Sequence, residues 1–234
     1  IRDPHGVHSA MTDCDAVLHL AALIAIPYSY HSPDTYVDTN IKGTLNVLQA
    51  ARTLNIERVI HTSTSEVYGT ARFVPITEEH PLQGQSPYSA TKIGADQLAL
   101  SFHSSFELPV VVVRPFNTYG PRMDLLDGRV VSNFIVQALK GEPITIYGDG
   151  TQTRSFCYVS DLINGILAMA GSQLLGPINL GNPREYSILR TAEMIIEKTK
   201  SSSVIVYQDL PSDDPQMRCP DITLAEKALS WRPS

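Results

Sequence analysis

Val110-Val-Val-Val113 is the stretch that decides the fold, because an uninterrupted run of valines is typical of a strand buried on both faces of a sheet. Ahead of it, Ser86-Pro87 indicates a helix N-cap followed by proline at the first helical position, and this predicts a long helix through about residue 102. Arg58-Val-Ile-His-Thr62 has the composition of the preceding strand. Strand, helix and strand of these lengths predict a right-handed crossover in a parallel sheet.

The segment before residue 58 repeats this pattern. Asp15-Ala-Val-Leu-His-Leu20 is a short apolar run that predicts another buried strand, and Ser32-Pro33 predicts the start of a helix. Apolar residues then recur at spacings of four, four and three, which predicts a stripe packed on the sheet: Val37, Ile41, Leu45 and Leu48. The fold class predicted is therefore α/β, with a Rossmann-like, doubly wound parallel sheet.

The pattern becomes looser after Pro115. A helix is expected near 130–140, a strand at 144–147, and further helices starting near Ser160 and Ser187. These shorter elements predict a smaller C-terminal α/β lobe. In a doubly wound sheet, ligands bind beyond the carboxyl ends of the strands, so functional residues are expected there.

Composition excludes several classes of protein. The net charge of −6 comes without any Lys/Arg run, so no nucleic-acid partner is expected. Apolar runs stay well short of the roughly 18 residues that a membrane span needs, so no membrane partner is expected either. Cys14, Cys157 and Cys219 lie far apart and lack metal-ligand spacing, which predicts no metal site and favours the reducing cytoplasm.

Tyr88-Ser-Ala-Thr-Lys92 is a Tyr-x-x-x-Lys pattern that opens the helix capped by Ser86. Residues four apart lie on the same face of a helix. A lysine ammonium next to a tyrosine hydroxyl is expected to lower the pKa of that phenol from about 10 toward a value useful for proton transfer. The alternative is that both are surface residues at a common spacing.

Thr62-Ser-Thr-Ser-Glu-Val-Tyr-Gly69 follows the strand that ends at Thr62. Its hydroxyls and Glu66 are therefore expected at the carboxyl edge of the sheet. Short hydroxyls there could bind a substrate hydroxyl, and the carboxylate could remove a carbon-bound proton. The alternative is a Ser/Thr cluster that caps a turn, but the combination with Tyr88 and Lys92 favours a catalytic site.

Five motifs together resemble the NAD-dependent epimerase/dehydratase family of nucleotide-sugar enzymes, part of the extended short-chain dehydrogenases/reductases. They are His19-Leu-Ala-Ala22, Asn40-Ile-Lys-Gly-Thr-Leu-Asn46, Ser63-Thr-Ser-Glu-Val-Tyr-Gly69, Tyr88-x-x-x-Lys92 and Arg114-Pro-Phe-Asn-Thr-Tyr-Gly-Pro-Arg122. The resemblance runs from Ile1 to Ser234. It implies a dinucleotide-binding domain at 1–122 and mainly a substrate lobe at 123–234, with some segments returning to the first domain.

By this resemblance Tyr88 takes the proton of the sugar 4-hydroxyl, Lys92 holds the nicotinamide ribose of NAD, and Thr64 binds the reacting hydroxyl. The catalytic set implied is Thr64, Ser65, Glu66, Tyr88, Lys92 and Arg154. The residues implied to contact NAD are Leu20, Ala21, Ala22, Asn40, Thr62, Ser63, Tyr88, Lys92 and Pro115. Those implied to contact the nucleotide sugar are Asn117, Arg122, Arg129, Tyr147, Arg154 and Arg218.

The glycine loop with which this family begins is not in the chain. Gly148-Asp-Gly150 has no third glycine in register and lies in the substrate half. An N-terminal βαβ unit of about 30 residues or more is therefore expected to be missing. Without the glycine loop and its ribose selector, the choice of NAD over NADP rests on the family alone.

The two halves resemble different members of the family. Asp127-Gly-Arg-Val-Val-Ser-Asn-Phe134, Tyr147-Gly-Asp-Gly-Thr-Gln-Thr-Arg-Ser-Phe156, Asn179-Leu-Gly-Asn-Pro183 and Asp213-Asp-Pro-Gln-Met-Arg218 resemble UDP-glucuronate decarboxylases. That likeness implies a phosphate contact for Arg218, a phosphate or sugar-carboxylate contact for Arg154, and a place near the nucleotide for Tyr147. Ala25-Ile-Pro-Tyr-Ser-Tyr30 and Ser86-Pro-Tyr-Ser-Ala-Thr-Lys92 instead resemble nucleotide-sugar 4,6-dehydratases.

The function predicted is a nucleotide-sugar lyase that oxidises the 4-position of a UDP-sugar and then releases carbon dioxide, acting as a cytoplasmic homodimer. A 4,6-dehydratase that uses Glu66 as its base is the alternative. Glu66 disfavours a simple 4-epimerase, and the intact set of Thr64, Tyr88 and Lys92 disfavours a non-catalytic nucleotide-sugar binding protein.

Overall fold

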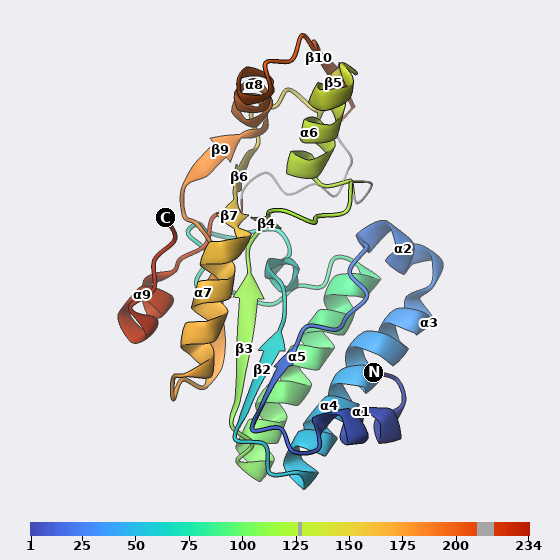
Figure 1. The fold of residues 1–234 in the computed structure, drawn as a ribbon, viewed down its shortest axis with the longest axis vertical. Helices are drawn as coiled ribbons and strands as arrows, with labels where there is room; N and C mark the ends of the chain where they lie inside the picture. Colours follow the sequence, from blue (N-terminus) through green and yellow to red (C-terminus); the bar gives the residue numbers. More distant parts are fainter. Residues whose placement is uncertain (126–127, 210–217) are drawn as a thin grey trace.

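The computed structural model describes residues 1–125, 128–209 and 218–234. At its centre lies a parallel sheet, with a smaller lobe beyond one end of the strands (Figure 1). The strands lie in the order β1 (Ala16–His19), β2 (Arg58–Thr62), β3 (Val110–Pro115) and β8 (Gly176–Leu180). This arrangement confirms the predicted α/β, Rossmann-like fold.

Helices cover the sheet on both faces because its central strands are apolar on both. One face carries α4 (Gly43–Thr53) and α5 (Pro87–Phe106), and the other carries α7 (Val159–Ala170) and α9 (Thr223–Leu229). The side chains of β3 alternate between these layers: Val110 and Val112 pack toward α4 and α5, while Val111 and Val113 pack toward α7. The run of valines is thus buried throughout, as predicted.

Helix α5 starts where the sequence predicts. The Ser86 hydroxyl accepts a hydrogen bond from the Ser89 amide, and the Ser89 hydroxyl accepts one from the Ser86 amide at 2.9 Å, so the two form a capping box. Pro87 occupies the first helical position. The helix extends four residues past the expected end, to Phe106, and Glu107 then adopts a left-handed conformation with φ of 56°.

The region before β2 differs from its expected form. After α2 (Ile26–His31) and α3 (Pro33–Tyr36), the chain forms a π-helical segment, η1 (Val37–Lys42), that leads into α4. A π turn holds more residues than an α turn and therefore rotates the following side chains. Val37 is 40% exposed and Asn40 and Thr44 are buried, so the expected apolar stripe is wrong at its first position. The sequence also gave no signal of α1 (Pro4–Met11), which Asp3 caps.

The smaller lobe consists of α6 (Val130–Lys140) and α8 (Ile188–Thr199) packed on a parallel pair of strands, β5 (Ile144–Tyr147) and β10 (Ile205–Gln208). Short pairs of strands join the lobe to the sheet: β4 (Thr118–Tyr119) with β7 (Cys157–Tyr158), and β6 (Thr153–Ser155) with β9 (Glu185–Ser187). The chain after residue 123 therefore builds the lobe and also returns to the sheet as α7, β8 and α9 (Figure 1).

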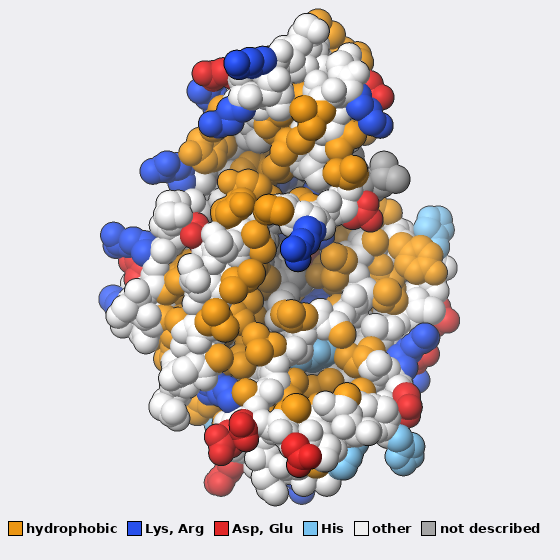
Figure 2. Space-filling view, viewed as in Figure 1, with side chains coloured by type: hydrophobic (Ala, Val, Ile, Leu, Met, Phe, Trp, Pro, Cys, Tyr) orange, Lys and Arg blue, Asp and Glu red, His pale blue; other side chains and the backbone are white. Residues whose placement is uncertain are grey.

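Hydrophobic side chains are exposed over α7 (Figure 2). Ile163 and Leu167 of this helix are exposed to solvent. On the same side of the sheet, Leu18 of β1 is 44% exposed because α7 packs over β2 and β3. Within the described ranges, no helix combines the length and the apolar character needed to cross a bilayer.

A matched pair of leucines tests where the core lies. Leu180 on β8 is fully buried, whereas Leu139 on α6 is 70% exposed. Leu180→Ala should lower the free energy of unfolding by about 2 to 5 kcal/mol, because it removes buried methyl groups and leaves a cavity. Leu139→Ala should change it by less than about 0.5 kcal/mol. Urea denaturation measures both, and equal losses would contradict this packing.

Candidate active site

A cavity of about 420 Å³ opens beyond the carboxyl ends of β2 and β3. In the space-filling view this face is hollowed between the sheet and the lobe (Figure 2). The predicted site residues that line the cavity are Thr62, Ser63, Thr64, Ser65, Glu66, Tyr88, Pro115, Asn117 and Arg129. Most of the residues that the sequence assigned to catalysis therefore lie around one space.

The backbone after β2 explains why this cluster of polar residues faces the cavity. Thr64 is extended and caps a short 3₁₀ helix, η2 (Ser65–Tyr68), by accepting a hydrogen bond from the Glu66 amide at 3.2 Å. Gly69, at φ of 63°, ends this helix in a conformation that favours glycine. The turn places Thr64 and Glu66 together at the sheet edge, where Thr64 also caps the short helix.

Tyr88 lies in the first turn of α5 and is buried against the cavity. Burial raises the pKa of the Tyr88 phenol to about 12, and the negative charge of Glu66 adds to the rise. A hydrogen bond from the Thr64 hydroxyl opposes the shift. The sequence predicted a lowered pKa, and that prediction is wrong for this chain because loss of hydration outweighs every favourable contact.

Lys92 lies one turn further along α5 and is also buried, with 4% of its surface exposed. Its Nζ donates a hydrogen bond of 2.6 Å to the carbonyl oxygen of Thr62, at the end of β2. Burial lowers the pKa of Lys92 to about 8, and the carboxylate of Asp96 opposes this shift. The ammonium is thus directed at the rim of the cavity by a backbone contact.

Arg218 forms an ion pair with Glu66, through Nη1 and Oε1. Its side chain is only 4% exposed, and its Nη2 has no hydrogen-bond partner among the residues that the structure describes. The sequence assigned Arg218 to a phosphate, whereas the fold places it against the carboxylate of the Tyr88 cavity. The rest of its motif, residues 213–217, lies outside the described residues.

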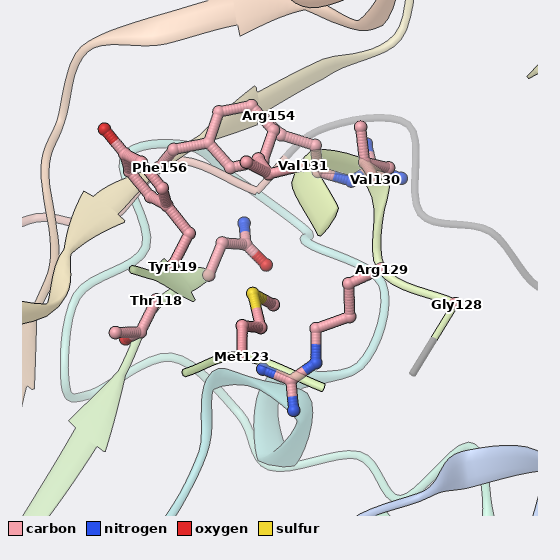
Figure 3. Close-up of a pocket in the computed structure, with 10 residues that line it drawn as sticks. Thr118, Tyr119, Met123, Gly128, Arg129, Val130, Val131, Arg154 and Phe156 are labelled. Atoms are coloured by element: carbon pink, nitrogen blue, oxygen red, sulfur yellow. The ribbon is translucent and has the colours of Figure 1, made fainter. Parts of the chain in front are cut away.

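A second cavity, of about 190 Å³, adjoins the first through Asn117, Thr118 and Arg129, which line both. Arg129 and Arg154 approach it from different sides, and Tyr119 and Phe156 form its aromatic wall (Figure 3). The Nδ2 of Asn117 and the Oγ1 of Thr118 are buried without a hydrogen-bond partner in the described part of the chain. Polar atoms of this kind are suited to a ligand that supplies their partners.

A third space continues the row and brings in Tyr147. It shares Gly128, Val130 and Arg154 with the second cavity. Tyr147 and Arg154 therefore lie in the lobe, away from the cavity that contains Tyr88. Arg154 is 9% exposed and donates a hydrogen bond of 2.8 Å to the Thr153 carbonyl. Asp127, which opens the motif before Arg129, is outside the described residues.

Several predicted residues do not line these cavities. Leu20 and Ala21 are exposed and Ala22 is half-buried, on the segment after β1. Asn40 is buried, but its side-chain amide accepts from the Leu23 amide at 2.9 Å and donates to the Leu23 carbonyl at 3.0 Å, so it fixes this segment. Arg122 is exposed, at φ of 66°.

Ile24, Ile26 and Leu162 form an apolar wall of the first cavity that the sequence did not reveal as part of the site. The two isoleucines follow the His19-Leu-Ala-Ala22 motif on alternate positions, and this was the only local signal. Leu162 comes from α7, far along the chain, and its place is decided by the packing of α7 on the sheet.

The sequence model of the GDP-mannose 4,6 dehydratase family matches residues 1–234. The chain belongs to this family, in agreement with the predicted epimerase/dehydratase resemblance. UDP-glucuronic acid decarboxylase 1 of Arabidopsis thaliana is 41% identical over 232 residues, which are 97% of this chain and 53% of that protein. The chain thus spans about half the length of this relative.

Two solved structures are similar to this chain over nearly its full length. A UDP-N-acetylglucosamine 4-epimerase from Methanobrevibacter ruminantium, in complex with UDP-N-acetylmuramic acid, has a TM-score of 0.94 and 34% identity, over 97% of this chain and 74% of that one. A UDP-glucuronic acid 4-epimerase from Bacillus cereus, in complex with UDP-glucuronic acid and NAD, has a TM-score of 0.91 and 31% identity. The match covers 99% of this chain and 75% of that one.

The environment of Tyr88 predicts opposite effects from two substitutions. Thr64→Val removes a hydrogen bond that lowers the pKa of Tyr88, so the pKa should rise above about 12. Glu66→Gln removes a negative charge that raises it, so the pKa should fall. NMR of tyrosine Cζ, assigned with Tyr88→Phe and recorded where circular dichroism shows an intact fold, measures both. Shifts in the same direction would contradict the environment described.

Proposed function

We propose that the protein is an NAD-dependent nucleotide-sugar lyase that decarboxylates UDP-glucuronate. The observation that carries the proposal is the place of Arg218, a buried cation with an unsatisfied Nη2 among the described residues, in contact with Glu66 at the cavity of Thr64 and Tyr88. With Nη1 paired to Glu66, Nη2 of this guanidinium could bind a carboxylate on the reacting sugar. The 41% identity to a decarboxylase supports the same reaction.

The residues around the end of β2 fit the nicotinamide ribose of NAD. The hydroxyls of Thr62 and Ser63 are buried and have no hydrogen-bond partner within the described ranges, and the Lys92 ammonium lies beside them on the Thr62 carbonyl. A ribose diol would satisfy such groups. NAD, when bound, accepts a hydride from the sugar and later returns it.

The first step is oxidation at C4, and Tyr88 and Thr64 are the residues that act on the hydroxyl. Thr64 holds the 4-hydroxyl through its own hydroxyl, and Tyr88 takes the proton from oxygen as the C4–H bond gives up its hydride. The neutral Tyr88 of this chain, with a pKa of about 12, must therefore lose its proton when ligands fill the cavity. The Lys92 ammonium would favour the phenolate, and oxidised NAD would add to this positive charge when bound.

The second step follows from the position of the new ketone. The carboxylate on C5 becomes β to the C4 carbonyl, so the C5–C6 bond can break with its electron pair moving to the C4 oxygen. Carbon dioxide leaves, and C5 of the resulting enolate takes a proton from water. When the hydride returns to C4, Tyr88 gives its proton back to the C4 oxygen, and the product is UDP-xylose. Arg218 orients the carboxylate before it leaves, while Thr64 stays on the C4 oxygen.

The row of cavities leading into the lobe accounts for the nucleotide part of the substrate. Asn117 and Arg129 lie between the Tyr88 cavity and the second space, where the diphosphate would follow the sugar. Arg154 and Tyr147 line the next space in the row, where the nucleoside would follow the diphosphate. In this arrangement Arg154 contacts the nucleotide, and Arg218 contacts the carboxylate, which was one of the two partners that the sequence left open for Arg154.

A 4,6-dehydratase is the second candidate, and the place of Glu66 favours it. Glu66 lines the same cavity as Tyr88 and could remove the C5 proton after oxidation, with water leaving from C6. The family whose model matches the chain is also described as a dehydratase. Against this reading, Glu66 is engaged by Arg218 and does not stand free in the cavity.

Product analysis separates the two candidates. The intact gene product, incubated with NAD and UDP-glucuronate, should release carbon dioxide and UDP-xylose, detected by mass spectrometry. UDP-glucose and dTDP-glucose should give no 4-keto-6-deoxy sugar. Tyr88→Phe, as the control, should slow turnover by about a hundredfold or more because the base is lost. Formation of a 4-keto-6-deoxy product, abolished by Glu66→Gln, would establish the dehydratase instead.

The two arginines should have different effects on substrate binding. Arg218→Ala should weaken UDP-glucuronate by about 2 kcal/mol or more, roughly thirtyfold in Kd, while changing the Kd of neutral UDP-glucose much less. Arg154→Ala should weaken both ligands alike, because both carry the same nucleotide. Calorimetry with the NAD-loaded protein measures these four affinities. If only Arg154→Ala weakens UDP-glucuronate more than UDP-glucose, the carboxylate site lies at Arg154.

A further inference from the structure

Beneath the reaction cavity lies a buried group of charged and titratable side chains that the proposed reaction does not use. Asp96, on α5 one turn after Lys92, accepts a hydrogen bond from Arg114 Nε at 3.1 Å through Oδ2. His61 Nε2, on β2, lies 3.4 Å from the other oxygen, Oδ1. Asp96 and His61 have no exposed surface, and Arg114 is 2% exposed.

The carboxylate of Asp96 is paired with one buried cation and acts electrostatically on a second. Arg114 comes from β3, and Lys92 shares a face of α5 with Asp96 because the two are four residues apart. Only Oδ2 of Asp96 has a hydrogen-bond partner in the described part of the chain; Oδ1 has none. Asp96 thus accepts from Arg114 and lies near His61, and its negative charge also acts through space on Lys92, one turn earlier on the helix.

The other groups around Lys92 do not supply this charge. Burial lowers the pKa of His19, on β1, to about 3 and also lowers that of His61, so both imidazoles are neutral near pH 7. Tyr88 on the same helix is neutral, with a pKa raised to about 12 by burial. Glu78, from the loop after η2, faces Arg114, which donates to its carbonyl at 3.3 Å.

Asp96 itself remains ionised. Burial alone would raise the pKa of this carboxyl, but its contacts with His61 and the positive charge of Arg114 hold the pKa below its usual value. Asp96 is thus the negative charge, among the residues that face Lys92, that is present at neutral pH.

We propose that Asp96 is a positioning residue for Lys92: its buried carboxylate keeps the Lys92 ammonium charged and directed at the Thr62 carbonyl, where the cofactor ribose is bound. This inference rests on the proposed NAD-dependent oxidation at Tyr88, but not on which lyase reaction follows it. An ammonium that has lost its proton would no longer donate in full to the ribose, nor favour the phenolate of Tyr88.

The direction of the pH effect follows from the charges. With Asp96 present, the pKa of Lys92 is lowered by burial only to about 8, so the ammonium persists at neutral pH. Removing Asp96 removes the charge that opposes the fall, so Lys92 should lose its proton at a lower pH. The alkaline limit of the oxidation step should move in the same direction.

The first test needs neither substrate nor turnover. In the chain labelled with ¹³C, the Lys92 Cε signal, assigned by comparison with Lys92→Arg, should titrate about one pH unit or more lower in Asp96→Asn. Asp96→Glu should restore the original midpoint. His61→Leu is the packing control and should leave the midpoint in place, because a neutral group is exchanged for an apolar one. An unchanged midpoint in Asp96→Asn would overturn the proposal.

A second variant keeps the test decisive if Asp96→Asn does not fold, since that substitution leaves Arg114 unpaired in the core. The double variant Asp96→Asn, Arg114→Gln replaces the ion pair by a neutral, hydrogen-bonded pair. Its Lys92 midpoint should lie below that of Arg114→Gln alone, which lacks the same cation but keeps Asp96. A midpoint equal to or above that of Arg114→Gln would show that Asp96 does not sustain the charge.

The second test uses the NAD-loaded holoenzyme and follows nicotinamide reduction in the first turnover as a function of pH. The alkaline limb should move to lower pH in Asp96→Asn and stay in place in His61→Leu. A purely structural role would lower the rate equally at every pH, and that result would overturn the proposal. If the protein proves not to oxidise nucleotide sugars, the lysine titration still decides the role of Asp96.

Discussion

The buried ion pair between Arg114 and Asp96 is the interaction on which the arrangement of the site depends. Arg114 is among the largest fully buried side chains, and its guanidinium joins α5 to the Tyr68 hydroxyl at 3.1 Å and to the loop carbonyl of Glu78. Tyr68 in turn donates to Asn179 of β8 at 2.6 Å. Breaking a buried pair by removing one partner costs about 3 to 5 kcal/mol, so these elements are held in one geometry.

The position of the cavity follows from that geometry. With α5 fixed against β2 and β3, Tyr88 faces the polar segment that follows β2, and the carboxyl ends of parallel strands leave a crevice there. The lobe closes the other side because the chain leaves the sheet after β3 and returns through α7. The polar groups of Thr62, Ser63, Asn117 and Thr118, which have no hydrogen-bond partner in the described part of the chain, lie along this crevice.

The Tyr-x-x-x-Lys pair shows what local spacing can and cannot predict. Spacing places Tyr88 and Lys92 on one helical face, and the structure agrees. Their ionisation depends instead on burial, on Thr64 and Glu66 beside Tyr88, and on Asp96 near Lys92, and it runs opposite to the expectation for Tyr88. Desolvation is set by everything packed around a group, so its magnitude is not contained in a short motif.

The sequence by itself determined the parallel sheet, the capped helix α5 and the polar cluster after β2, because each rests on local rules: a run of buried valines, a Ser-Pro cap and the residue types at a strand end. It failed at Val37, where a π turn rotates the helix, and at α1. Only the tertiary structure decided that Arg218 meets Glu66, while Arg154 lies away in the lobe. The contact between Arg218 and Glu66 joins residues that are 152 positions apart. Such pairs are set by how the whole chain packs, which no local pattern encodes.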